Sequence, residues 1–445
     1  MDYARVPSTD AAVLSGDVAQ GWRQTLPQQI LSVLPLTLFF PVGVMYFGVL
    51  LFYVGLLASG GFTRKIQRLR QSPVLLPIFA LSLVSVVIAA SHGMPDDNVR
   101  EFWPGFWHYQ TYLFLLPFIT VAPGIWQRRA MYVFFAGAVL AASLFVANAF
   151  HLLPANTLFR SYVVYEGNKS ILLGILLAVA AAWMLHELRL HRDHLLWRVL
   201  AIVYVAVTLI LLAKTRTASL LFVLLCVILI LRQMGWSWRT FALPLVLLAA
   251  LFGGWKYALS LPPPPTCEIR LVQAGPWEIF KLRSICTIQQ LRDFSQGRKV
   301  NEDGMRLEIY RITADIIAEA PVAGHGIASW MPLYQKKAKG LSSATMTTPH
   351  NDYLLYLTEL GVFGLLALLA IWATQLWTAR RMSLHESQHE SQHERGSVAE
   401  LAMPLLMLTV AMMLGGMFNA ILRDGVFGMA FMILLAIPLA GLRSE

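Results

Sequence analysis

Residues 348–377 read TPHNDYLLYLTELGVFGLLALLAIWATQLW, so a polar hexapeptide lies directly before a long apolar segment. The segment from Leu354 to Trp377 is long enough to cross about 30 Å of hydrocarbon as a helix. His350 stands at its entrance, and an imidazole with its ordinary pKa of about 6.5 is suited to moving protons. This stretch therefore predicts a membrane helix with a chemically active polar end.

The composition extends this interpretation to the whole chain. Of its 445 residues, 57% are hydrophobic and 13% are charged, whereas a typical soluble domain has about 25% charged residues. Apolar runs of membrane-spanning length recur, which predicts helices rather than a barrel with its weaker alternating pattern. The net charge of +10 is spread over short loops and forms no basic stripe, so it indicates membrane orientation rather than nucleic-acid binding.

We therefore predict an all-α polytopic membrane protein with about twelve transmembrane helices. Residues 28–59 are too long for one crossing and contain Pro41 near the middle, so we expect two short helices that meet there. The other predicted crossings are 72–92, 106–123, 130–152, 170–187, 196–213, 217–231, 240–258, 354–378, 398–420 and 425–442. Helices 1–9 thus occupy 28–258, and helices 10–12 fall within 351–445.

Loop charges predict the orientation. Arginine-rich loops alternate along the chain, with Arg64, Arg128 and Arg189 as examples, and should be cytoplasmic. The N-terminal segment 1–27, the loop 379–397 and both chain termini fall on that side. The region 259–350 falls on the opposite, extracytoplasmic side. Lys214 and Arg216 also lie on the outer side, against the rule, and these two cations call for a functional reason.

The large outer region predicts three local features. Four successive prolines at 262–265 should form a stiff extended spacer. Cys267 and Cys286 share one polar region, and an extracytoplasmic location predicts a disulfide between them. The spacing of apolar residues predicts a helix over 303–320, with Asp303 as its N-cap.

A near-repeat of His-Glu-Ser-Gln occupies residues 384–394 of the predicted cytoplasmic loop. Its three histidines and three glutamates could bind a metal. A tandem duplication in an unconstrained loop produces the same pattern, and we favour that interpretation.

Two arginines are candidates for anion binding. Arg216 is flanked by Thr215 and Thr217, so guanidinium and hydroxyl donors could bind a phosphate together; the alternative is an interfacial side chain that snorkels. Lys214 is a second contact or an interfacial anchor. Arg306 lies in the first turn of the predicted helix, where a cation opposes the helix dipole. It therefore faces a ligand anion, unless it forms an ion pair with Glu302.

His350 is the candidate general base, because it begins a defined turn into a helix. Asp352 could orient its imidazole or cap the helix. His325, between two glycines, is better explained as a loop residue than as a catalytic one. One base and two fixed cations indicate chemistry on a phosphate ester. Four further residues near the predicted outer face are second-rank candidates for lining the cavity: Asn168, Lys169, Arg423 and Asp424.

Ordered blocks in the second half of the chain resemble the O-antigen ligase and polymerase superfamily. The blocks are TRT at 215–217, GMRLEIY at 304–310, PVAGHG at 321–326, PHNDYL at 349–354 and LGVFGL at 360–365, whereas the first five helices carry no matching motif. The resemblance implies a GT-C-like glycosyltransferase of the bacterial inner membrane with a periplasmic active site. It also implies an undecaprenyl-diphosphate-linked O-antigen donor and a lipid A core acceptor.

In this resemblance, Arg216 and Arg306 match diphosphate-binding arginines and His350 matches the catalytic histidine. The chain departs from the pattern at Tyr310, where tryptophan is more usual, and at His325, where the family is variable. We expect His350 to deprotonate the acceptor hydroxyl while the arginines stabilise the departing diphosphate. No metal-binding spacing occurs in the outer region, and no paired carboxylate is evident. We therefore predict a metal-independent inverting transferase without a cofactor.

Two rival functions remain open. An O-antigen polymerase would share the donor and the site, but it would use a second lipid-linked glycan as acceptor. The large outer region with its basic residues favours docking of a phosphorylated lipid A core, and hence a ligase. A transporter or flippase for the same lipid should show charged residues at mid-membrane and paired broken helices, whereas the candidates here lie at one interface.

Overall fold

The computed structural model describes residues 22–93, 99–150, 152, 168–212, 216–234, 302–388 and 400–442, with isolated positions between 246 and 293. Every regular element in these ranges is helical. In chain order they are α1 (Trp22–Val33), η2 (Leu34–Phe39), α2 (Val42–Ala58), α3 (Phe62–Arg70), α4 (Leu75–His92), α5 (Val99–Tyr109), η3 (Thr111–Phe114), α6 (Leu115–Ile119), α7 (Ile125–Ala149), α9 (Asn168–Leu190), α10 (Leu195–Leu211), α11 (Arg216–Met234), α14 (Glu302–Glu319), α15 (Trp330–Lys337), η4 (Ser342–Thr345), α16 (Asp352–Gln388), α18 (Ala402–Phe418) and α19 (Gly425–Leu439).

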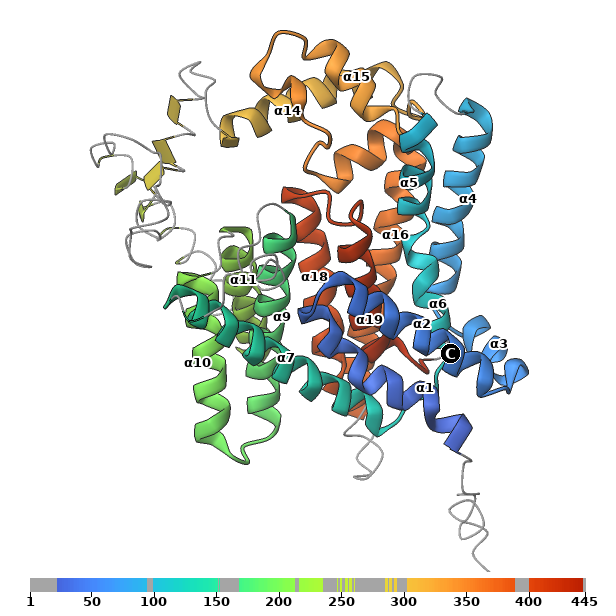
Figure 1. The fold of residues 1–445 in the computed structure, drawn as a ribbon, viewed down its shortest axis with the longest axis vertical. Coiled ribbons are helices and arrows are strands. Elements are labelled where there is room, and N and C mark those ends of the chain that lie inside the picture. The colour runs from blue at the N-terminus through green and yellow to red at the C-terminus, as the bar shows by residue number, and fades with distance from the viewer. Residues whose placement is uncertain are drawn as a thin grey trace, which may run out of the picture.

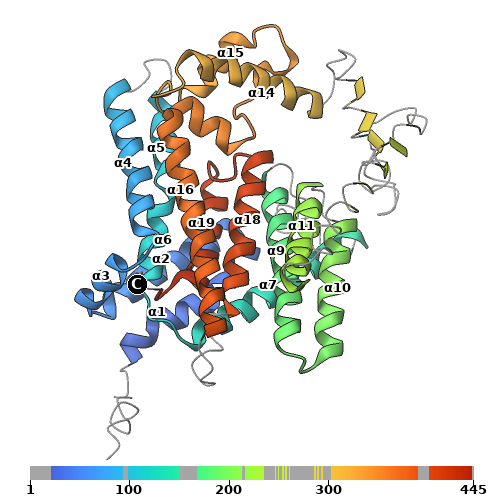
Figure 2. The ribbon, with the colours of Figure 1, turned by 180° about the vertical axis from the view of Figure 1, so that it is seen from behind.

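The helices form a bundle with α18 and α19 at its centre (Figures 1 and 2). α4, α5 and α16 lie on one side, α9, α10 and α11 lie on the other, and α14 and α15 cover one end. α19 is the most enclosed helix, since all its residues from Phe427 to Leu439 are buried. By contrast, α4 leaves Leu76 and Leu83 exposed, as expected for side chains that face lipid.

Four described helices, α4, α7, α9 and α16, are long and apolar enough to cross a membrane. The pair α2 and α3, bent by 114°, would add a fifth span, and α10, α18 and α19 are shorter apolar helices. These elements agree with a polytopic membrane protein. The predicted number of twelve and the assignment of 259–350 to one side stay predictions, because most of 235–301 lies outside the described residues.

The N-terminal helices agree with the predicted break, with one difference. The helical chain is interrupted between η2 and α2, directly before Val42, where Pro41 was expected to separate two helices. α1, however, begins at Trp22, inside the segment 1–27 that was expected to be polar.

The predicted crossing at 106–123 is not one continuous helix, because α5, η3 and α6 divide this region into three short pieces. The chain turns at Gln110, whose side-chain amide donates to the Ser85 hydroxyl at 2.6 Å and accepts from the Ser82 hydroxyl at 2.6 Å. These bonds tie the turn to α4. Polar contacts between helices therefore override the apolar pattern.

α16 is longer than predicted and contains a break. It continues through Gln388, so the predicted loop 379–397 begins as helix, while the repeat's side chains lie outside the described residues. At Gly361 the backbone is left-handed, with φ of 66°, and a Cβ there would lie 2.1 Å from the Val322 carbonyl oxygen. Only glycine fits.

Backbone groups freed by this break are satisfied by the α14–α15 connection. The Thr358 carbonyl accepts from His325 N at 2.8 Å, and the Glu359 carbonyl accepts from Gly326 N at 3.1 Å. The break therefore docks the end-covering helices onto α16.

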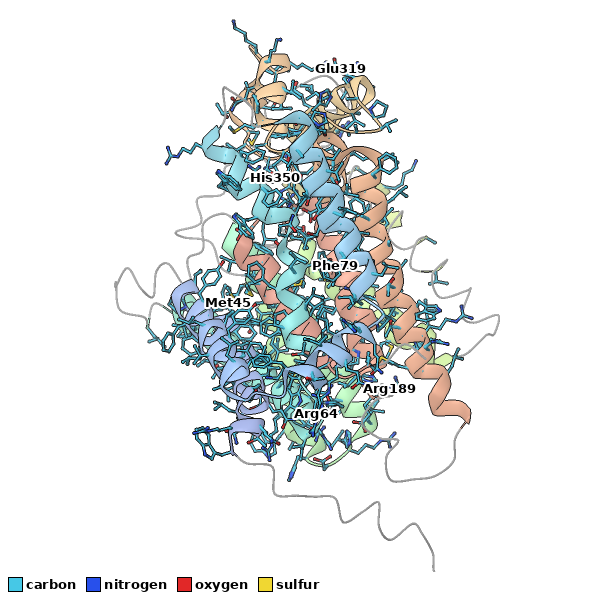
Figure 3. All side chains as sticks on the ribbon, turned by 90° about the vertical axis from the view of Figure 1, so that its right-hand side faces the viewer. Met45, Arg64, Phe79, Arg189, Glu319 and His350 are labelled. Atoms are coloured by element: carbon cyan, nitrogen blue, oxygen red, sulfur yellow. The ribbon has the colours of Figure 1, made fainter. Side chains whose placement is uncertain are left out.

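Predicted cytoplasmic and outer residues separate to opposite ends of the molecule. Figure 3 shows Arg64 and Arg189 toward one end, and His350 and Glu319 toward the other. α14 begins at Glu302, so Asp303 lies in its first turn and the prediction that Asp303 is its N-cap is wrong.

Candidate active site

His350 lies in a tight turn directly before α16, with a left-handed backbone at φ of 50°. The turn is held from both sides: the Asn351 carboxamide oxygen accepts from Leu354 N at 3.0 Å, and its nitrogen donates to the Met417 carbonyl at 2.9 Å. The Tyr310 hydroxyl lies 3.3 Å from the His350 carbonyl oxygen. Contacts from α14, α16 and α18 thus fix an uncommon backbone conformation at this histidine.

The imidazole lines a pocket at the covered end of the bundle. The pocket has a volume of about 630 Å³, including its open mouth. Its lining comes from the turn before α16, the α18–α19 connection, and the adjoining ends of α9 and α19: Ile171, Thr347, Thr348, His350, Asn419, Ala420, Ile421, Arg423, Asp424 and Phe427. Segments about 250 residues apart in the chain therefore build one site.

The surroundings of His350 keep its ring neutral. Burial, the Arg306 guanidinium and the Arg423 guanidinium lower its pKa from 6.5 to about 4, in that order of importance. Burial and the two neighbouring cations all disfavour the protonated, positively charged form of the ring. At neutral pH the ring has a free lone pair and can accept a proton.

Arg423 is more central than its sequence position suggested. Its guanidinium donates to the Thr347 carbonyl and lines the pocket with His350. The sequence placed it near the outer face but offered no motif that ranked it with Arg306. The missing signal is the contact between the α18–α19 connection and the turn before α16.

Asp424 follows Arg423 and has a local structural role. Its carboxylate accepts from Val426 N at 2.9 Å and so caps α19. The residue also lines the pocket. The cap fixes the direction in which α19 leaves the site, which supports its prediction as a residue near the cavity.

Asp352 has neither of the roles considered for it. Asn351 provides the capping oxygen for α16, and the buried Asp352 carboxyl instead accepts from Leu422 N at 3.2 Å. Gly416 of α18 allows this approach, since a Cβ there would lie 3.1 Å from the carboxyl oxygen. Asp352 therefore holds the backbone next to Arg423.

Arg216 is the first residue of α11 and is exposed. Because α9, α10 and α11 run alternately up and down the bundle, Arg216 lies at the same end as Ile171 of the pocket. Arg306 and Arg423 lie close enough to His350 for their charges to lower its pKa. Of the three arginines, Arg423 lines the pocket, whereas Arg306 and Arg216 are not part of the lining. Its contact with a donor stays a prediction.

Four other predicted residues fall outside what the structure describes. Lys214 is one of them, and the side chains of Asn168 and Lys169 are two more. Cys267 is the fourth, so the disulfide with the buried Cys286 stays a prediction.

His325 has a structural role that agrees with its interpretation as a loop residue. Its Nε2 lies 2.8 Å from the Ile316 carbonyl oxygen, and its backbone N–H donates to the Thr358 carbonyl of α16. The ring therefore ties the end of α14 to the break at Gly361.

A comparison with protein families gives a match over part of the chain. Residues 200–369 match the family model described as O-Antigen ligase. No curated protein sequence matches the chain significantly. The matched range contains Arg216, Arg306 and His350, and Arg423 lies beyond it.

Proposed function

From the match of residues 200–369 to the O-antigen ligase family model, we propose that this chain is an inverting, metal-independent O-antigen ligase. It would transfer O-antigen polysaccharide from undecaprenyl diphosphate to a sugar hydroxyl of the lipid A core. The observation that carries the proposal is a neutral histidine that lines a pocket beside two guanidinium groups. The site would face the periplasm, with both chain termini on the cytoplasmic side of the bacterial inner membrane.

The proposed reaction is a single displacement. The acceptor hydroxyl oxygen attacks the anomeric carbon, its proton passes to His350, and the bond from that carbon to the diphosphate oxygen breaks with its electron pair. Negative charge grows on the diphosphate, where Arg306 and Arg423 stabilise it, together with Arg216 if the donor extends to α11. Fixed guanidinium groups bind phosphate through paired donors.

The low pKa of His350 suggests how donor binding prepares the base. The arginines that lower this pKa are the same groups that would bind the diphosphate. A bound anion would offset their charge, so the histidine pKa should rise toward neutrality when the donor is present. The base would then become stronger at the step that needs it.

Metal independence follows from the same charges. Two guanidinium groups beside His350 supply positive charge where many transferases use a divalent cation. The proposal therefore needs no Lewis acid, and excess chelator tests it directly.

A transporter is the rival from a different class, and the break in α16 bears on it. Broken membrane helices often line ion or substrate paths. The break at Gly361 is instead packed against the α14–α15 connection, which bonds the freed carbonyls. This packing favours a fixed scaffold for the covered end of the bundle.

The test is reconstitution of the purified chain with undecaprenyl-diphosphate-linked O-antigen, lipid A core and excess chelator. Wild type and His350→Ala are compared for glycan attached to lipid A. Transfer by wild type alone would support a metal-independent ligase with an essential histidine. A lengthened donor glycan with unmodified lipid A would establish the polymerase reaction. If neither product forms, the enzyme assignment is contradicted.

A further inference from the structure

A second pocket lies beside the site, between α5, α15 and α16. It has a volume of about 480 Å³ including its open mouth. Its lining comes from these three helices, the α14–α15 connection and the α18–α19 connection: Glu101, Pro104, Gly105, His108, Ala328, Trp330, Met331, Leu355, Glu359 and Arg423. Arg423 therefore lines both pockets, and the reaction proposed above leaves the other residues without a role.

The floor of this pocket carries a buried carboxyl group that keeps hydrogen-bonding capacity. Glu359 is 6% exposed. One carboxyl oxygen accepts from the Tyr109 hydroxyl at 2.7 Å, and the other lies 3.4 Å from Trp330 N. The Ala328 backbone N–H also bonds this carboxyl. Because the two oxygens together have four acceptor positions, these three bonds leave one position for a ligand.

His108 provides a second, independent indication of a ligand. Its side chain is 6% exposed, and the backbone of Leu422 gives the ring one weak hydrogen bond, so at least one ring nitrogen has no partner among the described residues. Burying an imidazole nitrogen without a hydrogen bond costs free energy unless a ligand or a water provides the partner. Its place in the pocket lining puts it within reach of the same ligand as Glu359.

The chemistry of the lining fits a sugar ring. Acceptor oxygens, an imidazole and a guanidinium match hydroxyl groups, which both donate and accept. Pro104, Met331 and Leu355 offer apolar surface for the C–H face of a pyranose. Glu359 is seven residues after Asp352, on the same face of α16 and about 10 Å along the helix, so a sugar here would lie close to the first pocket.

We propose that this second pocket binds the sugar that presents the accepting hydroxyl, with Glu359 and His108 bonding its other hydroxyl groups. The proposal rests on the transferase function proposed above and assigns the two substrates to two pockets that meet at Arg423. Glu359 and His108 are positioning residues in this scheme, and His350 remains the base.

The test measures initial rates of Glu359→Gln and Met331→Trp while each substrate is varied separately. Met331 is partly exposed at the pocket, so a tryptophan there fills it without touching the bonds of Glu359. Glu319→Gln is the matched control, because Glu319 is exposed and pairs with Lys337 on the surface. Lipid A core and undecaprenyl-linked glycan are offered as acceptors in separate arms, and binding of free core oligosaccharide is measured by calorimetry.

We expect both pocket variants to raise the KM for the acceptor at least tenfold, with the donor KM and the Glu319→Gln kinetics within twofold of wild type. The arm in which this happens identifies the acceptor. Unchanged acceptor KM in Met331→Trp, or an equal rise in donor KM, would overturn the proposal. If wild type transfers nothing, the calorimetry decides. Binding of core oligosaccharide that is lost in Met331→Trp would support the pocket and reject the transferase, and absence of binding to wild type would reject both.

Discussion

Histidines at the two ends of the bundle have opposite surroundings. His191, at the end marked by Arg189 in Figure 3, lies 3.4 Å from the Glu187 carboxylate and 4.0 Å from that of Glu400. His350, toward the other end, faces Arg306 and Arg423. Carboxylates beside His191 join it to neighbouring segments of the bundle, whereas the guanidinium groups beside His350 keep that ring neutral and attract an anion. The difference marks one end as a scaffold and the other as a reaction site.

Replacing each histidine by glutamine should give the largest contrast. His350→Gln removes the base, and we expect kcat for transfer to fall about 10²- to 10⁴-fold. His191→Gln should stay within about twofold of wild type, because its contacts lie at the opposite end. Equal losses in the reconstituted transfer assay would contradict the functional difference between the two ends.

The arginines should give the next largest effect. Arg306→Gln and Arg423→Gln each remove a fixed positive charge beside the departing diphosphate, and we expect about 10²- to 10³-fold lower kcat. Arg198→Gln is the control, since Arg198 forms a surface pair with Asp193 at 2.7 Å, and exposed pairs of this kind contribute little to stability. Arg216→Gln tests whether the donor also reaches α11, and an unchanged kcat there would remove Arg216 from the site.

The pH profile should report the charges around His350. In free wild-type enzyme the acid limb of kcat/KM should lie near the pKa of about 4, while kcat should show a higher limb because the bound diphosphate offsets the arginines. Arg423→Gln removes a charge that disfavours the protonated ring, so the pKa rises and the kcat/KM limb moves to higher pH. A limb that stays in place or moves to lower pH would show that Arg423 does not act on His350.

Tyr310→Phe should have the smallest effect. It removes the hydroxyl beside the His350 and Met417 carbonyls, at 3.3 and 3.2 Å, and we expect a loss of about 0.5–1.5 kcal/mol in unfolding free energy with a severalfold lower kcat. Tyr353→Phe is the matched control, because its hydroxyl donates to the Met413 carbonyl at 3.0 Å without touching His350. Thermal unfolding and kcat should separate the two: both variants lose stability, and only Tyr310→Phe loses rate. A kcat loss in both would point to general loosening.

Some of the site could be predicted from local sequence, and some could not. His350 and Arg306 lie in blocks whose turn and helix signals are readable along the chain, and α14 with the turn before α16 brings them together. Arg423 joins them through a contact between distant parts of the chain: Leu422 N donates to the carboxyl of Asp352, which lies 70 positions earlier. No periodicity records such a contact, and Glu359 was missed because it is part of an otherwise apolar helix.

The sequence by itself determined that the chain is a helical membrane protein and which residue types are available for the site. In lipid each backbone polar group must bond within its own segment, so long apolar runs predict membrane helices. The sequence shows a glycine at position 361, but it did not predict that the helix breaks there. Only the tertiary structure decided which polar side chains meet. Helix packing at close-approach positions such as Gly416 sets those contacts, and the resulting burial and neighbouring charges give His350 its chemistry.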